Sequence, residues 1–110
     1  MTALYQKPAL FIDIDGTIVK HHTSEWLPGA RERLIALSVA HRIIFMTMRG
    51  PQDAGTEWSV LKTIELLHSL PFKYTLLTSV GGPRTMIDDS EIRLLRTRRD
   101  SADWVNFHGT

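Results

Sequence analysis

Apolar residues recur in short blocks along the chain, and the blocks follow two different spacings. Residues 8–14, 41–46 and 74–80 are short runs rich in β-branched and aromatic residues, which is typical of buried strands. Residues 30–40 and 56–70 carry apolar residues three and four positions apart, which predicts helices. Because strands and helices alternate with short connections, the pattern predicts an α/β fold with a mainly parallel central sheet.

Polar and turn residues mark the ends of these elements. Pro28 suits the start of the first helix, and Pro71 ends the second because it has no amide hydrogen to donate. Thr56 or Asp53 is the predicted N-cap of the second helix, since a short polar side chain there accepts an amide hydrogen.

The last third of the chain predicts three further elements. Residues 84–87 read as a short fourth strand, residues 90–99 as a helix, and residues 104–107 as a short fifth strand. The sequence contains no repeat and no linker, so a single domain over residues 1–110 is expected.

Composition narrows the class of protein. The chain is 43% hydrophobic and 23% charged, with a net charge of +1, so no overall field favours nucleic acid or a membrane surface. It has no cysteine, which excludes thiol nucleophiles and thiolate metal sites. No apolar run approaches the roughly 20 residues of a membrane helix. No secretory signal is visible, so a cytoplasmic protein is the default expectation.

Acidic and hydroxyl residues gather where the predicted strands end. Asp13 and Asp15 end the first strand, Thr47 follows the second and Asp88 follows the fourth. The carboxyl ends of parallel strands meet at one edge of a sheet, so we expect these residues on one rim. Carboxylates that share a site repel one another, and a divalent cation such as Mg2+, which prefers hard oxygen ligands, relieves the repulsion.

The stretch Asp13-Ile14-Asp15-Gly16-Thr17 resembles the DxDGT signature of the haloacid dehalogenase-like (HAD) superfamily, whose members are mostly Mg2+-dependent phosphotransferases. Two further matches follow in the right order, Thr47 and the acidic stretch at 86–89, and together they span residues 8–91. The resemblance implies a three-layer, Rossmann-like HAD fold.

The resemblance also implies roles for the first motif. Asp13 is the implied nucleophile, which forms an aspartyl-phosphate, and a metal ligand. Asp15 is implied to protonate the leaving oxygen, then to activate water, and to touch the metal through its carbonyl. Gly16 and Thr17 are implied to offer backbone N–H groups to the phosphoryl oxygens, and Thr47 to hydrogen-bond the same group. The alternative is a strand that ends in an ordinary Asp-Gly turn.

Asp88 and Asp89 are the remaining implied Mg2+ ligands, and which of them binds directly stays open. Their alternative role is the acidic N-terminus of a helix. Met48 and Arg49, in the loop after Thr47, are candidate phosphate- or substrate-binding residues. Arg49 either holds a second phosphate or carboxylate of the substrate or is a solvated loop arginine.

The chain departs from the superfamily at the basic position before the acidic motif, where a lysine is usual. Residues 81–84 read Gly-Gly-Pro-Arg, so Arg84 is the nearest substitute, with Lys73 and Lys62 as other candidates. A planar guanidinium is not equivalent to an ammonium group, and the departure bears directly on catalysis.

The gaps in which superfamily members carry a cap domain are short here; the first is the loop at 19–28. We therefore expect no cap and an open site, which suits a large phosphorylated substrate or a lid from a second copy in a homo-oligomer. Four arginines near the C-terminus are expected to form a solvated helix face, with contact to a polyanionic substrate as the alternative: Arg93, Arg96, Arg98 and Arg99. The tryptophans Trp26, Trp58 and Trp104 are expected to lie partly in the core, with stacking on a base or sugar as the alternative.

Together these features predict a Mg2+-dependent phosphatase that acts through an aspartyl-phosphate on a substrate the sequence does not identify. The alternative is a non-catalytic phosphate- or nucleotide-binding module of the same fold that has lost turnover with its lysine. A third interpretation is an interaction subunit that keeps only the fold.

Overall fold

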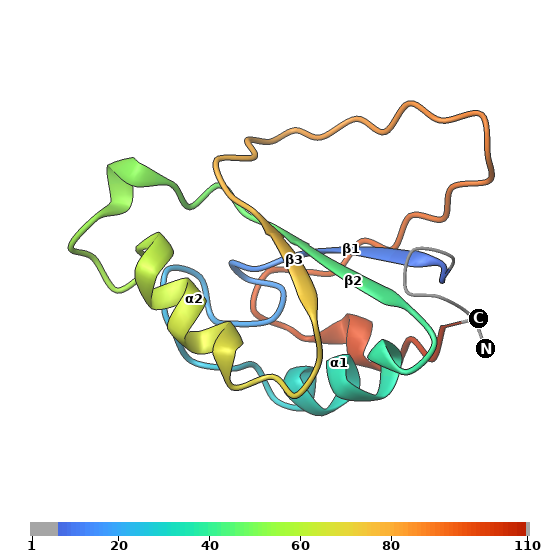
Figure 1. Ribbon diagram of the computed structural model, residues 1–110, viewed down its shortest axis with the longest axis horizontal. Coiled ribbons are helices and arrows are strands. Elements are labelled where there is room, and N and C mark those ends of the chain that lie inside the picture. Colours follow the sequence, from blue (N-terminus) through green and yellow to red (C-terminus); the bar gives the residue numbers. More distant parts are fainter. Residues whose placement is uncertain (1–6, 110) are drawn as a thin grey trace.

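The computed structural model describes residues 7–109 and is built on a three-stranded parallel sheet (Figure 1). The strands, in sheet order, are β1 (Ala9–Asp13), β2 (Arg42–Met46) and β3 (Tyr74–Leu77). At the carboxyl edge Asp13 lies opposite Met46, and Met46 lies opposite Leu77. The predicted α/β class and the parallel sheet are confirmed.

The first two strands are each followed by a helix: α1 (Ala30–Ser38) follows β1 and α2 (Val60–His68) follows β2. Two short 3-10 turns are η2 (Pro51–Asp53) and η3 (Asp103–Asn106). The N-cap of α2 is Ser59, whose hydroxyl accepts the N–H of Lys62 at 3.1 Å. The predicted caps, Thr56 and Asp53, are wrong because the Asp53 carboxylate instead accepts the N–H of Gly50 in the η2 turn.

The core lies between the sheet and the helices, which occupy the same side of it in Figure 1. Ile43 and Phe45 of β2 are fully buried there against Leu34 of α1 and Leu67 of α2. On the opposite face of the sheet, Phe11 is 45% exposed. The described residues thus form a sheet with one helical layer, and a three-layer arrangement remains a prediction.

The C-terminal third differs most from its prediction. Residues 84–87 form no strand and residues 90–99 form no helix; this segment runs without regular structure across the top of Figure 1. Arg93, Arg96 and Arg99 recur every three residues, and like charges at that spacing on a helix repel one another. A short helix also needs an apolar face to pack, whereas Leu94 is 88% exposed.

The predicted fifth strand at 104–107 is also wrong, since most of it belongs to η3. Trp104 explains the difference. Its indole N–H donates to the carbonyl of Thr17 at 2.6 Å, and its ring packs against the core. This long-range contact, rather than a strand pairing, fixes the chain near its C-terminus.

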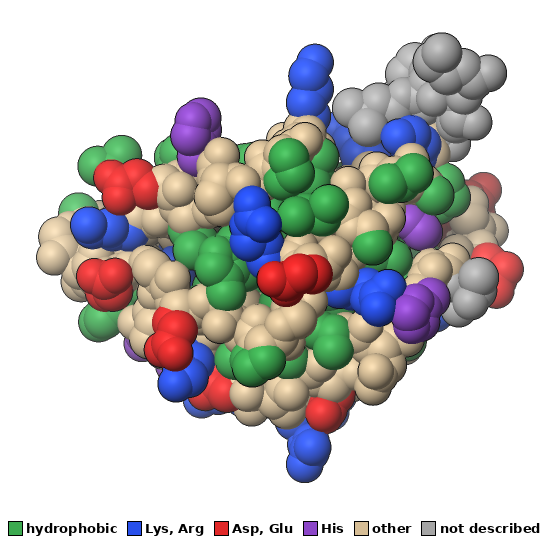
Figure 2. Space-filling view, turned by 90° about the horizontal axis from the view of Figure 1, so that it is seen from below, with side chains coloured by type: hydrophobic (Ala, Val, Ile, Leu, Met, Phe, Trp, Pro, Cys, Tyr) green, Lys and Arg blue, Asp and Glu red, His purple; other side chains and the backbone are tan. Residues whose placement is uncertain are grey.

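In residues 7–109 no helix has both the length and the apolar character to cross a bilayer. Figure 2, seen from below, shows acidic and basic side chains interspersed over that face, in keeping with the small net charge.

Candidate functional site

The first predicted site residue, Asp13, ends β1 at the carboxyl edge of the sheet. One of its carboxylate oxygens accepts the hydroxyl of Thr17 at 3.0 Å. The other lies 3.3 Å from the guanidinium of Arg84. The Asp13 and Arg84 side chains are 33% and 30% exposed, so this ion pair is open to solvent. Asp13 is therefore an oriented, accessible carboxylate with a cation beside it.

Asp15 is held in a different way. Arg49 donates two hydrogen bonds to its carboxylate, from Nε at 2.9 Å and from Nη2 at 2.7 Å, and the N–H of His22 donates a third at 2.8 Å. Burial alone would raise the pKa of Asp15, but the hydrogen bonds from Arg49 and His22 and the nearby positive charge outweigh it, so its pKa lies below the ordinary value. Asp15 is a fixed carboxylate.

Arg49 is almost completely buried, with 1% of the side chain exposed. Besides Asp15, its guanidinium donates to the hydroxyl of Thr63 at 2.8 Å and to the carbonyl of Thr23 at 2.7 Å. The interpretation of Arg49 as a solvated loop arginine is wrong, because these partners hold its planar fork inside the protein. The structure directs the guanidinium at Asp15 and not at an open surface.

The other predicted site residues of the loops after β1 and β2 differ in exposure and in hydrogen bonding. The N–H of Gly16 donates to the carbonyl of Val19 at 2.8 Å, and that of Thr17 donates to Ile14 at 3.1 Å, so both predicted phosphate donors are engaged in the turn itself. Thr47 is fully buried, and its hydroxyl accepts the N–H of Arg49. Met48 is 60% exposed.

The acidic pair lies apart from this group. Asp88 and Asp89 are exposed in the irregular segment, and their nearest partner is Ser90, whose N–H donates to Asp88 at 2.9 Å. The expected rim therefore brings Asp13 and Thr47 to adjacent strand ends but does not include Asp88. Asp88 is missing from the rim because residues 84–87 do not form the predicted fourth strand, which would have carried the acidic pair to the sheet.

These positions test the expected Mg2+ site. Within residues 7–109 no three acidic or histidine side chains come together in a way that could hold a metal ion. Asp15 already accepts three N–H donors, and Asp13 already has Thr17 and Arg84. The residues, as arranged, do not fit a resident Mg2+.

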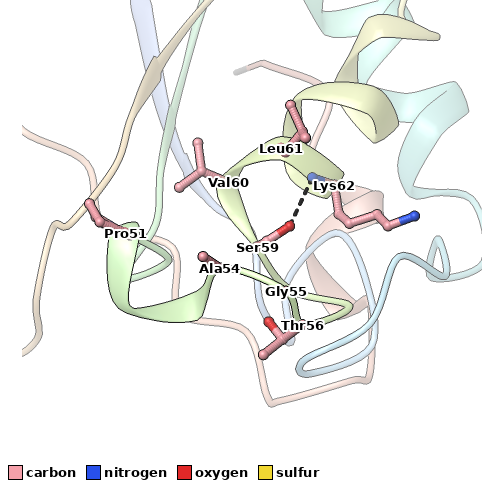
Figure 3. A pocket seen from close by; sticks show the side chains of 9 residues that line it. Pro51, Ala54, Gly55, Thr56, Ser59, Val60, Leu61 and Lys62 are labelled. Carbon is pink, nitrogen blue, oxygen red and sulfur yellow. Dashed lines mark hydrogen bonds between the residues drawn. The ribbon is translucent and has the colours of Figure 1, made fainter.

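The alternative cations do not lie at the site. Lys73 is exposed just before β3, at the amino end of the sheet, whereas Asp13 lies at the carboxyl end. Lys62 is 3.9 Å from Glu65 and lines an open hollow of about 320 Å³ between the η2 loop and the start of α2, where Figure 3 shows its side chain extending outward. Arg84 is thus the basic residue that reaches Asp13.

Sequence reasoning missed a contact between the motif loop and the C-terminal segment. The N–H of Asp100 donates to the carbonyl of Gly16 at 2.8 Å, and the N–H of His21 donates to the Asp100 carboxylate at 2.9 Å. Gly16 has φ +77°, and a Cβ there would lie 2.9 Å from Cγ of Arg99. Glycine is needed at position 16 for both reasons. Nothing local in residues 97–104 signals this contact.

The loop at 19–28, in which a cap would have been inserted, is folded over Asp15. The His22 ring stacks between those of His21 and Trp58, with ring centroids 3.9 and 4.6 Å apart. His22 has φ +58°, an uncommon conformation for a residue other than glycine, and its N–H donates to Asp15. Trp26 and Trp104 pack against the core, as one interpretation expected, whereas Trp58 makes this surface stack.

Comparisons of the chain with protein-family models, with curated proteins and with solved structures found no significant match.

Proposed function

We propose that the chain is a phosphatase of the HAD-like type in which Asp13 is the nucleophile. The observation that carries this proposal is the setting of Asp13: a solvent-accessible carboxylate at the carboxyl end of a parallel strand, oriented by Thr17 and 3.3 Å from the Arg84 guanidinium. Ligands of open α/β sheets bind at that edge, and a positioned cation can neutralise charge that develops on a transferring phosphoryl group.

The chemistry proceeds in two steps. An oxygen of Asp13 attacks phosphorus while the bond to the leaving oxygen breaks, and water then hydrolyses the aspartyl-phosphate to release inorganic phosphate. Arg84 stabilises the phosphoryl oxygens in both steps. The leaving oxygen takes a proton from solvent, and the water that attacks in the second step returns one to solvent. Asp15, which three N–H donors hold as a carboxylate, is unsuited to protonate the leaving group and instead fixes the motif loop beside Asp13.

The resemblance also implies Mg2+ dependence and a three-layer fold. Both would require residues 84–99 to form a strand and a helix, with Asp88 and Asp89 beside Asp13, so the proposed role of Asp13 depends on neither. Because the described carboxylates do not fit the metal, no step above runs through it. The open surface around Asp13 and Arg84 suits a large phosphorylated substrate.

The test is release of phosphate from an aryl phosphate by the wild type and by Asp13→Asn. Asparagine is nearly isosteric but is a far poorer nucleophile, so turnover should disappear while the circular dichroism spectrum stays the same. A matched control is Asp103→Asn, which breaks another exposed aspartate–arginine pair, to Arg98 at 2.9 Å. Undiminished turnover in Asp13→Asn, or equal loss in both variants, contradicts the role of Asp13.

A second candidate function is a phosphate-binding module without turnover. The fixed state of Asp15 favours it, because a carboxylate locked by Arg49 is a poor proton donor to an alkoxide leaving group. A wild type that binds phosphate but releases none from any phosphoester would select this alternative.

A further inference from the structure

The motif places two carboxylates two positions apart, at Asp13 and Asp15, and positive charge nearby relieves their repulsion. In the structure each carboxylate has its own guanidinium: Arg49 at 2.7 Å from Asp15 and Arg84 at 3.3 Å from Asp13. A bidentate arginine matches a carboxylate in both charge and shape. The repulsion between the two acids is therefore already relieved by side chains of the chain.

The position of Arg84 also bears on the acidic pair. The Asp88 carboxylate accepts the N–H of Ser90 at 2.9 Å, and the Asp89 carboxylate lies 3.5 Å from the Ser90 hydroxyl. In the described residues the charged partner of Asp13 is Arg84 and not the acidic pair.

The Arg84 guanidinium is held in place by two contacts and keeps N–H donors available for a ligand. Its Nη1 faces Asp13, and its Nη2 donates to the carbonyl of Val80 at 3.1 Å. A guanidinium has five N–H donors, so further donors remain for a ligand, and the side chain is 30% exposed. A dianion beside Asp13 would meet this cation first.

A third arginine lies against the motif loop. Arg99 lies with its Cγ against Gly16, next to Asp15 and Thr17 in the chain, and is exposed. Within residues 7–109 it forms no ion pair. Arg49 and Arg84 are each matched to one carboxylate, and Arg99 balances the carboxylate of Asp100, whose N–H donates to Gly16 of the same loop.

Resting on the proposed function, we infer that arginine side chains take the charge-balancing role expected of a divalent cation, and that the site binds a phosphate dianion through Arg84 without a metal ion. The ligand class is a phosphate monoester or inorganic phosphate. The metal site expected from the resemblance is thus replaced by guanidinium groups of this chain.

Isothermal titration of the full chain with inorganic phosphate, in EDTA and again in excess Mg2+, tests this inference. Phosphate should bind in EDTA, and Mg2+ should change the Kd by less than about threefold, a difference below 1 kcal/mol. Arg84→Gln should weaken binding by roughly tenfold or more under both conditions, the scale of one charge-assisted hydrogen bond. Arg96→Gln, an exposed arginine of the same segment, is the matched control and should bind like the wild type.

Phosphate binding that requires Mg2+, binding unaffected by Arg84→Gln, or no binding in either buffer each overturns the inference. The readout is separate from turnover. Phosphatase activity that appears only with Mg2+ would overturn the inference and leave the proposed function standing. Metal-free binding that depends on Arg84 but is never followed by hydrolysis would leave the inference standing and remove the proposed function.

Discussion

The two aspartates of the motif each pair with an arginine from elsewhere in the chain, and the two pairs differ in their exposure to water. Arg49 and Asp15 are 1% and 14% exposed, whereas Arg84 and Asp13 are 30% and 33% exposed. The buried pair is satisfied on every side by Thr63, the Thr23 carbonyl and the His22 N–H. The same pair of side-chain types is thus buried and structural in one case and open to solvent in the other.

This difference gives the largest expected effect on stability. Arg49→Met leaves Asp15 as an uncompensated charge in a largely dry setting, so the free energy of unfolding should fall by about 3–5 kcal/mol. Arg84→Met removes a solvent-exposed partner and should cost less than about 1 kcal/mol. Urea unfolding followed by circular dichroism measures both, and equal losses in the two variants would contradict the division between the pairs.

The open pair should dominate turnover instead. If Arg84 stabilises the transferring phosphoryl group, Arg84→Ala should lower the turnover of an aryl phosphate by roughly a hundredfold or more, the scale for one preorganised contact to a transition state. Arg84→Lys should recover little activity if fork geometry matters, and more if charge alone is needed.

Arg96→Ala, which changes an exposed arginine of the same segment, is the matched control and should turn over like the wild type. A measurable wild-type rate that ignores Arg84→Ala would remove Arg84 from the proposed chemistry.

Local sequence patterns predict part of the fold and part of the candidate site. The elements up to residue 77 follow local patterns: alternating strands, helical spacing and a proline stop. The same local information leads to Asp13, because an apolar strand that ends in acids is visible in a few residues. It also leads to Arg84, which is the nearest basic residue to the acidic motif.

Long-range contacts account for what local patterns do not predict. The sequence around Arg49 does not distinguish a solvated arginine from a buried one. Arg49 is buried because it donates to Asp15 and Thr63, which are 34 and 14 residues away. Residues 84–87 have the composition of a strand, but a strand needs a partner, and Arg84 is anchored at Asp13 instead. Trp104 is drawn to the Thr17 carbonyl, 87 residues away, in place of the predicted strand.

The smallest expected effect is the pH dependence of the buried pair. The pKa of Asp15 is lower in the folded protein than its ordinary value of 3.8, since Arg49 and His22 stabilise the charged form more than burial disfavours it. A lowered pKa contributes stability that is complete above the unfolded value and is lost as pH falls through the folded value. Wild-type stability should therefore decline as pH falls below about 3.8. In that range the unfolded chain binds up to one more proton at Asp15 than the folded protein does.

Asp15→Asn removes that titration, so its stability, although lower at neutral pH, should depend less on pH in the same acid range. The measurement is the free energy of unfolding in urea at a series of pH values, compared through its slope and not its absolute value. Asp89→Asn is the control, because that exposed carboxylate has Ser90 as its hydrogen-bond partner among residues 7–109 and makes no ion pair there. If Asp15→Asn and Asp89→Asn keep the same acid slope as the wild type, Arg49 does not hold Asp15 as a carboxylate, and the distinction between a structural and a reactive pair fails.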